Sequence, residues 1–393
     1  MTRICVLLQN FYEIDIRVRR KTEALIAAGY AVDVLALQSP YRSSKDYTLD
    51  GVHVYTFSLG KKRGSIVRYY FEYISFLFWS FFKLFALTRT RKYAVIDVNN
   101  LPDFLVFAAM PGRWTGAKIL FDMHEITPEF LMSKYNVGKN HWQVRLARLL
   151  ERGSISYADH VITINEPIQR LLESRGLAPT KSTIIMNSVD ELMFSSGSGT
   201  TLAENDPRTD RFVMMYHGTL THIYGLDIAL EAFSLVRDQL RHAELWIMGN
   251  GPEKAALEKQ ARTLGLEKKV RFIKMVLPQE VPRWLSQCDI GILPTRGDVF
   301  LDLSFSNKLS EYIIMGKAVI ASRLKTIRHY FGEEALAYFE PNNPADLAKQ
   351  MARLYGDRAL YGRLAERAKY EYAPFAWSVM KTRYLDLLTG LTD

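Results

Sequence analysis

The residues with the clearest chemical potential lie in the stretch SFSNKLSEYIIMGKAVIAS, residues 304–322. Polar and basic side chains stand where a short helix is expected to begin, and Glu311 follows about one turn later. The start of a helix has unpaired N–H groups and the positive end of the helix dipole, so it attracts phosphate groups. A carboxylate one turn further along suits ribose hydroxyls better than phosphate. The pattern predicts a site for a phosphorylated nucleoside, unless Ser306 only caps the helix and Glu311 only faces solvent.

Two turns that contain glycine follow predicted strands earlier in the same half of the chain. The strand RFVMMY leads into His217, Gly218 and Thr219, and the strand AELWIM leads into a turn with Gly249 and Gly251. Small residues at the end of a strand let a ligand approach the backbone. The second turn alone is a weak dinucleotide signal, because the full three-glycine fingerprint is missing.

In the first half of the chain, His124 follows the predicted strand AKILFD. Ligands of open α/β sheets bind beyond the carboxyl ends of the strands, so a histidine at this place is a candidate for catalysis. A lone histidine is otherwise more often structural. Both interpretations of His124 stay open at the level of the sequence.

Short apolar strands alternate with helical patterns along the chain, which predicts two doubly wound parallel sheets flanked by helices. Between Ser195 and Asp210 the sequence is rich in Gly, Ser, Thr, Asp and Pro and almost lacks apolar residues, so this stretch is expected to connect two domains. We predict an N-terminal Rossmann-like domain over 1–195 and a C-terminal one over 196–374. An amphipathic helix over 375–393 is expected to pack back across the domains.

Length and composition limit the possible functions. A chain of 393 residues is too long for a single core and fits two domains. Its net charge of +9 lies mostly in the first half and favours an anionic partner, while no nucleic-acid-binding motif accompanies it. Two cysteines in apolar contexts favour neither disulfides nor a zinc site, and no spacing typical of metal ligands is visible. The N-terminus lacks the pattern of a signal peptide, so a cytoplasmic location is expected.

The segment 69–87, YYFEYISFLFWSFFKLFAL, is dense in aromatic residues, and basic clusters flank it. One interpretation is a buried helix of the first domain. The other is a helix that lies in the interface of an anionic membrane, with aromatic anchors and basic flanks. Neither predicts a helix that spans the bilayer, since no window reaches about 18 uncharged apolar residues.

In their order and spacing, several segments resemble retaining glycosyltransferases of family 4, which have the GT-B fold. The resemblance covers nearly the whole chain, and the segments that carry it include DIRVRRKTEALIAAGYAVDVLAL, FDMHEITPEF, YHGTLTHIYGLDIALEAF, LWIMGNGPE and SNKLSEYIIMGKAVIAS. It implies two Rossmann-like domains that face an interdomain cleft. The second domain would bind a nucleoside diphosphate sugar, and the first would bind the acceptor.

The resemblance also implies roles for particular residues. Those with a donor-binding role are Gly218, Thr219, Gly249, Val276, Leu277, Ser306, Asn307, Lys308 and Glu311. His124 corresponds to the family's histidine near the transferred sugar and is the candidate catalytic residue. The family's glycine-rich loop is replaced by QNFYEIDIRVRR, in which Asp15, Arg17 and Arg19 are candidates for the acceptor side.

The sequence departs from the family pattern at three positions. Leu303 stands where many members carry a first acid, and Thr219 and Tyr224 stand near the usual arginine and lysine. Because negative charge builds on the leaving diphosphate, its stabilisation is left to Lys308, to the helix dipole and to His222 or Arg296.

Three functions follow as hypotheses from these patterns. The first is a retaining, metal-independent hexosyltransferase without a cofactor, active in envelope polysaccharide or glycolipid biosynthesis. Its acceptor is expected to be lipid-linked or a polysaccharide, and the enzyme is expected on the inner face of the cell membrane, in contact through 69–87. The alternatives are a nucleotide-sugar epimerase and a non-catalytic GT-B scaffold.

Overall fold

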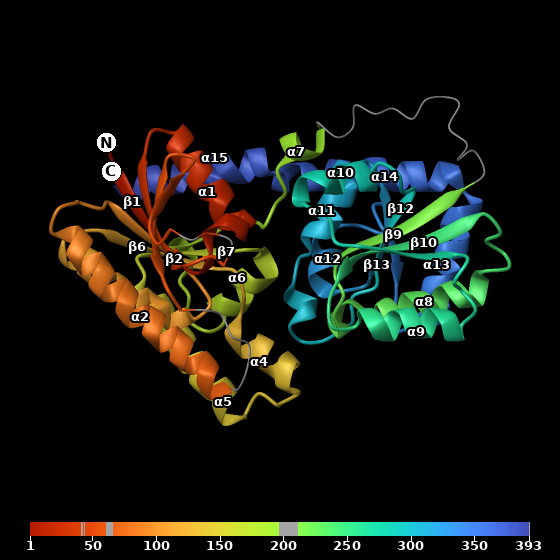
Figure 1. Ribbon diagram of the computed structural model, residues 1–393, viewed down its shortest axis with the longest axis horizontal. Helices are drawn as coiled ribbons and strands as arrows, with labels where there is room; N and C mark the ends of the chain where they lie inside the picture. The colour runs from red at the N-terminus through yellow and green to blue at the C-terminus, as the bar shows by residue number, and fades with distance from the viewer. Residues whose placement is uncertain (41, 43, 60–65, 196–210, 393) are drawn as a thin grey trace. The chain divides into compact units, whose positions relative to one another are not determined.

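The computed structural model describes residues 1–40, 42, 44–59, 66–195 and 211–392. The chain forms two compact units, Met1–Asn187 with Met380–Asp393, and Ser188–Val379 (Figure 1). Residues 188–195 thus pack with the second unit, and the chain returns to the first unit at Met380. Most of the linker predicted at 195–210 lies outside the described residues.

The first unit is built on a sheet with the strand order β3-β4-β2-β1-β5-β6-β7-β8, in which β3 alone is antiparallel to its neighbour. Strands β1 and β2 are apolar and almost entirely buried, as expected for parallel strands covered on both faces. The strands are β1 (Arg3–Phe11), β2 (Ala31–Leu37), β3 (Tyr47–Leu49), β4 (Val52–Phe57), β5 (Val95–Asn99), β6 (Lys118–Met123), β7 (His160–Thr163) and β8 (Ser182–Ile184). The helices are η1 (Tyr12–Ile14), α1 (Ile16–Ala27), α2 (Ile66–Thr88), η2 (Asp103–Ala109), α3 (Met110–Trp114), α4 (Thr127–Tyr135), α5 (Trp142–Tyr157), α6 (Glu166–Glu173) and η3 (Pro179–Lys181).

The second unit has a parallel sheet with the order β11-β10-β9-β12-β13-β14. Its strands are β9 (Phe212–Thr219), β10 (Ala243–Asn250), β11 (Val270–Ile273), β12 (Ile290–Leu293), β13 (Ala318–Ser322) and β14 (Ala337–Phe339). Its helices are α7 (Glu191–Ser195), η4 (His222–Tyr224), α8 (Leu226–Val236), α9 (Lys254–Thr263), η5 (Pro278–Glu280), α10 (Val281–Leu285), η6 (Leu301–Leu303), α11 (Asn307–Ile314), α12 (Lys325–Tyr330), α13 (Pro344–Gly356), α14 (Arg358–Tyr372) and η7 (Ala373–Phe375). The last helix, α15 (Trp377–Thr392), begins in this unit and continues in the first. The predicted pair of doubly wound α/β sheets is therefore confirmed.

The strand order of each sheet reverses at one place. In the first unit the chain proceeds outward from β1 in one direction and from β5 in the other, and in the second unit the same happens at β9 and β12. Such a reversal leaves a crevice at the carboxyl ends of the two central strands, where doubly wound folds bind their ligands. The two sheets therefore specify where a site is to be sought in each unit.

Helix α2 contains the aromatic segment of the first unit and has two distinct faces. Glu72, Phe76, Ser80 and Leu84 follow one another every four residues and are buried. The opposite face exposes a stripe of apolar side chains at helical spacing, formed by Phe71, Ile74, Phe78, Phe82 and Phe85. Complete burial, the first of the two interpretations of 69–87, is therefore wrong for this stripe.

By length and composition alone, the stretch Tyr70–Thr88 of α2 could also cross a membrane, which the sequence analysis did not predict, and 28% of this stretch is buried within the unit. The buried face carries Glu72, which forms an ion pair with Arg68. That face packs into the unit, since Phe76 lies against Phe57 and Trp79.

Candidate active site

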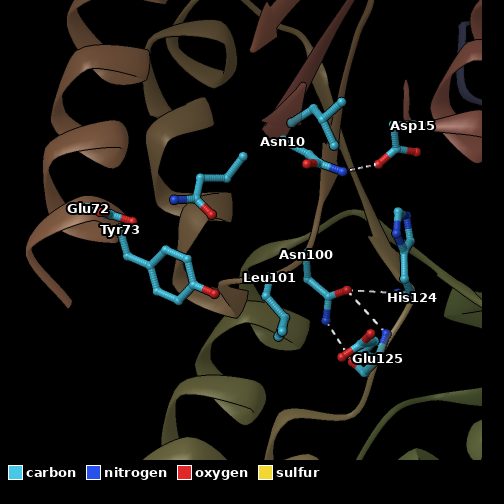
Figure 2. A pocket seen from close by; sticks show the side chains of 10 residues that line it. Asn10, Asp15, Glu72, Tyr73, Asn100, Leu101, His124 and Glu125 are labelled. Atoms are coloured by element: carbon cyan, nitrogen blue, oxygen red, sulfur yellow. Dashed lines mark hydrogen bonds between the residues drawn. The ribbon is translucent and has the colours of Figure 1, made fainter. Parts of the chain in front are cut away.

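A polar pocket of about 280 Å³ opens at the reversal point of the first sheet (Figure 2). Its walls come from the ends of three strands, the start of α1 and one side of α2. They are formed by Leu8, Gln9, Asn10, Asp15, Glu72, Tyr73, Asn100, Leu101, His124 and Glu125. The predicted residues Asp15 and His124 thus meet in one pocket, although 109 positions of sequence separate them.

Asp15 lies at the N-cap of α1, where its Oδ1 accepts a hydrogen bond from the backbone N–H of Val18 at 3.1 Å. Its Oδ2 accepts from the amide of Asn10 at 2.9 Å (Figure 2). The carboxylate is therefore held in place by the turn that joins β1 to α1.

His124 is fixed both at its backbone and at its ring. Its backbone N–H donates to Asn100 Oδ1 at 2.8 Å, and ring Nε2 lies 3.0 Å from Asn99 Oδ1 and 3.4 Å from Asp122 Oδ2. Both ring neighbours are acceptors, so Nε2 carries a hydrogen. Nδ1, which has no hydrogen-bond partner among the described residues, is left to accept from or donate to a ligand.

Beneath His124 lies a buried network of charged groups. Lys21 Nζ donates to Asp97 at 2.8 Å, to Asn99 Oδ1 at 3.1 Å and to Asp122 at 2.5 Å. Arg17 donates to both oxygens of Asp122. Burial by itself would raise the pKa of Asp122, but Arg17 and Lys21 hold it well below its usual range. Asp122 is therefore a carboxylate, and two cations face two carboxylates in the core.

Helix α15 completes this network from the far end of the sequence. The Tyr384 hydroxyl donates to Asp97 Oδ2 at 2.9 Å, and the side chain of Tyr384 is fully buried. Met380 is also buried, and its sulfur lies 3.3 Å from the backbone N of Met186. The terminal helix is thus an integral part of the first unit and supports the residues under the pocket.

The two predicted arginines do not line the pocket. Arg17 is buried, and its guanidinium donates hydrogen bonds to Asp122 and to the backbone carbonyl of Ile185. Arg19 pairs with Glu23 and Asp50 at the surface. The structure therefore places Arg17 in the supporting network and Arg19 on the outside of α1.

Glu125 and Asp103 are acids whose protonation is altered by burial at this site. Burial raises the pKa of Glu125, which lines the pocket. It also raises the pKa of Asp103 to about 6, although Asn100 and Thr127 donate hydrogen bonds to that carboxylate. Through Asn100, Asp103 helps to hold the backbone of His124.

In the second unit, the ends of β9 and β10 come together through two glycines. Gly218 and Gly249 are opposite each other in the register, with φ of +123° and +154°. A Cβ on Gly249 would lie 1.8 Å from the carbonyl oxygen of Gly218, so no other residue fits there. The exposed Thr219 follows directly, and its carbonyl accepts a hydrogen bond from Tyr216.

The predicted helix start lies beside these glycines. Helix α11 begins at Asn307 with Ser306 as its N-cap, and in the described part of the chain the Ser306 side chain makes no capping hydrogen bond. The alternative of simple capping by Ser306 is therefore wrong. Asn307 Oδ1 is buried and has no hydrogen-bond partner among the described residues. The first turn thus keeps polar groups that a ligand can use.

Lys308 extends from this turn across Gly218. A Cβ on Gly218 would lie 2.3 Å from Lys308 Cε, so the glycine makes room for the lysine. Lys308 Nζ lies 4.1 Å from the centroid of the Tyr224 ring and forms no ion pair with any described residue. A positive charge therefore stands at the helix start and is not neutralised by a carboxylate.

Glu311 is held by His217. Tyr312 donates to the carbonyl of Met215 at 2.6 Å, so it accepts from His217 Nδ1, which lies 3.0 Å away. His217 Nε2 forms a hydrogen bond with Glu311 Oε2. Because Nδ1 already carries a proton, this bond needs a second proton, which lies either on Nε2 or on the carboxyl group. Oε1 of Glu311 makes no hydrogen bond with any described residue, and this oxygen is free to accept from a ligand hydroxyl.

The remaining predicted contacts lie further out. Val276 and Leu277 follow β11, the edge strand beyond β10, and Leu277 is exposed. Arg296 pairs with Asp227 and donates to the carbonyl of His222, so its charge is already neutralised. Of Lys308 and Arg296, two of the side chains expected to replace the family's arginine and lysine, Lys308 is the one without a carboxylate partner among the described residues.

Several residues of the site were not among the predicted ones: Asn10, Lys21, Asp97, Asn99, Asn100, Asp122 and Tyr384. One signal was visible, since Asp97 and Asp122 interrupt apolar strands and Lys21 lies on an apolar helix face. A charge in a position that should be buried indicates a buried partner. Within the described residues, no group of three or more His, Cys, Asp or Glu side chains could hold a metal ion.

Comparison with known proteins agrees with this geometry. The family model described as "Glycosyl transferase 4-like domain" matches residues 14–188, and the model described as "Glycosyl transferases group 1" matches residues 211–357. Among curated proteins, the chain is 24% identical over 319 residues to the D-inositol 3-phosphate glycosyltransferase of Streptosporangium roseum, covering 78% of this chain and 71% of that protein.

Two solved structures have a similar fold. The sucrose-phosphate synthase of Thermosynechococcus elongatus has a TM-score of 0.79 at 18% identity, covering 100% of this chain and 99% of that one. Anabaena HepE in complex with UDP-glucose has a TM-score of 0.72 at 14% identity, covering 99% and 100%. At these identities the likeness concerns the fold.

Proposed function

We propose that this chain, which belongs to the group 1 glycosyltransferases and has their GT-B fold, transfers a sugar from a nucleoside diphosphate sugar to an acceptor hydroxyl. In the proposed reaction the configuration at the anomeric carbon is retained. The observation that carries the proposal is the start of α11, where Lys308, unpaired polar groups and the free oxygen of Glu311 lie together beside Gly218. HepE, of similar fold, was solved with UDP-glucose. The second unit is the donor domain in this proposal, and the first is the acceptor domain.

The proposed reaction breaks the bond between the anomeric carbon and the diphosphate oxygen. The acceptor oxygen forms the new bond on the same face of the sugar, and its proton passes to the departing diphosphate. Negative charge on the diphosphate is stabilised by Lys308 and by the N–H groups at the start of α11. We propose that His124 binds a hydroxyl of the transferred sugar through Nδ1, and that neither a metal ion nor a cofactor takes part.

The donor site is tested with nucleoside diphosphates and their sugars in a thermal-shift screen, since a ligand that binds only the folded state raises Tm. Glu311→Ala removes a charged acceptor of a ribose hydroxyl, so we expect the wild-type Tm shift to require about tenfold to hundredfold more ligand. Glu258→Ala, on the exposed side of α9, is the matched control and should behave like wild type. Wild-type protein that binds no nucleotide would refute the proposal, and binding of a sugar nucleotide that is never consumed would favour the scaffold.

We further propose that the first unit contacts the inner face of an anionic membrane through α2. The stripe of Phe71, Ile74, Phe78, Phe82 and Phe85 is exposed, and Trp114, which packs edge-on against Phe81, is 62% exposed next to it. Aromatic side chains of this kind anchor helices at membrane interfaces, and basic residues near the ends of the helix attract anionic lipids. An acceptor linked to a lipid would be presented at the same surface.

Flotation with vesicles of phosphatidylglycerol and phosphatidylcholine measures this contact. Phe78→Ala with Phe82→Ala removes two exposed rings, and we expect the partition coefficient to fall by at least about tenfold. Leu192→Ala with Leu235→Ala, two exposed leucines of the second unit, is the control. Equal partitioning of both double variants would remove the membrane proposal and leave the donor site untouched.

A further inference from the structure

A second cavity of the first unit is an apolar groove that adjoins the polar pocket. It lies among α2, η2, α4 and α5, and its apolar walls include Tyr70, Phe104, Phe130, Leu131, Leu146 and Leu150. Tyr73 and Leu101 line both the groove and the polar pocket. The two cavities therefore adjoin at these residues, one polar and with His124 at its wall, the other mainly apolar.

Exposed apolar residues lie on the helices that wall this groove. On α5, Trp142 is 63% exposed and Leu149 is 67% exposed, with Leu146 between them on the same helix face. On α2, Phe71 and Ile74 are exposed next to the groove residues Tyr70 and Tyr73. Soluble proteins rarely leave so many large apolar side chains together without a partner.

The accessible charge at the groove is positive. Lys134 lines it, with Nζ 5.3 Å from the centroid of the Phe130 ring, and Arg145 is exposed on α5. The single acid of the lining, Asp103, is buried and accepts hydrogen bonds from Asn100 and Thr127. The groove thus offers apolar walls with a lysine among them, which suits an apolar chain attached to an anionic or phosphorylated head.

We propose that this groove holds the apolar chain of a lipid acceptor whose hydroxyl-bearing head occupies the polar pocket, an inference that rests on the proposed glycosyl transfer. The chain passes Tyr73 and Leu101, lies between α4 and α5, and leaves along the exposed residues of α2 and α5. This path connects the reacting hydroxyl near His124 with the surface that we assign to the membrane. Helix α2 contributes to the whole of this path, because its residues line the polar pocket, line the groove and form the exposed stripe.

The test uses methyl, octyl, decyl and dodecyl β-D-glucosides below their critical micelle concentrations, with binding measured by calorimetry. For wild type, each added methylene that enters the groove should tighten binding by about threefold to fourfold. Leu146→Glu places a charge in the groove wall and should weaken dodecyl glucoside binding at least tenfold, with methyl glucoside unchanged. Ala147→Phe, which fills the groove, should do the same, and Leu235→Glu on α8 is the matched exposed control.

Three results of these binding measurements bear on the proposed lipid groove. Affinity that does not rise with chain length, or rises equally in wild type and in Leu146→Glu, overturns the inference. So does a wild-type dimer that Leu146→Glu dissociates without any chain-length dependence, since a second copy would then fill the groove. Nucleoside diphosphates added to the same proteins separate the two proposals: if they do not bind while the chain-length dependence persists, the donor site fails and the groove stands.

Discussion

Lys308→Ala should lower the rate of nucleoside diphosphate release from a sugar nucleotide about a hundredfold to a thousandfold, because it removes a preorganised cation from the leaving group. Thr219 and Tyr224 stand near the places where the sequence pattern of the family suggests an arginine and a lysine, and Arg296 is neutralised by Asp227. Lys308 itself forms no ion pair within the described part of the chain and lies across Gly218. The loss should appear in kcat, since charge builds on the diphosphate as the bond breaks.

Steady-state release of the nucleoside diphosphate, coupled to its enzymatic detection, measures this effect. Lys325→Ala is a suitable control, because that side chain is 78% exposed and pairs with Asp302 at the surface. Lys308→Arg, which keeps the charge, should recover part of the rate. A Lys308→Ala enzyme whose kcat stays within about twofold of wild type would show that the helix start stabilises the leaving group without this cation.

Asp122→Ala should destabilise the first unit by about 3–5 kcal/mol, the usual cost of breaking a buried ion pair. The variant leaves Lys21 and Arg17 with one carboxylate, Asp97, in a buried region. For a unit of this size such a loss lowers Tm by roughly 6–20 °C. Asp122 also touches His124, so the residual activity of the folded fraction should fall as well.

Thermal unfolding and urea titration measure the change in stability. Asp50→Ala breaks the exposed pair with Arg19 and should cost less than about 1 kcal/mol, which makes it the matched control. The double variant Lys21→Met with Asp122→Asn should be more stable than the sum of its single variants predicts, since it removes opposite charges together. Additive losses would mean that the two residues do not form a coupled network.

Periodic patterns explain why so much of the fold could be predicted. The buried strands β1, β2 and β9 consist mainly of apolar residues, and the helices between them have one apolar face, so the two parallel sheets follow from local sequence. The same is true of the start of α11, because Ser306, Asn307 and Lys308 are neighbours in the chain. Its position before the apolar strand β13 could also be predicted from the sequence.

The support beneath His124 could not be predicted in this way. Lys21, Asp122 and Tyr384 come from α1, β6 and α15, and no periodicity relates positions so far apart. Arg17 illustrates the limit, since its place beside Asp15 suggested an acceptor contact while the fold buries it against Asp122. Two positions, about half a turn of helix, separate the side chain that lines the pocket from the one that faces the core.

The amino-acid sequence by itself determined the two α/β sheets, the family and the helix start at Ser306–Lys308, because these depend on residues close together in the chain. Tertiary structure alone decided which charged side chains form ion pairs with one another and which remain available to a ligand. It placed an apolar groove next to the polar pocket, with Tyr73 and Leu101 lining both. The physical reason is that ion pairs and cavities depend on distances in space, which β-strand order and helix packing set between segments remote in sequence.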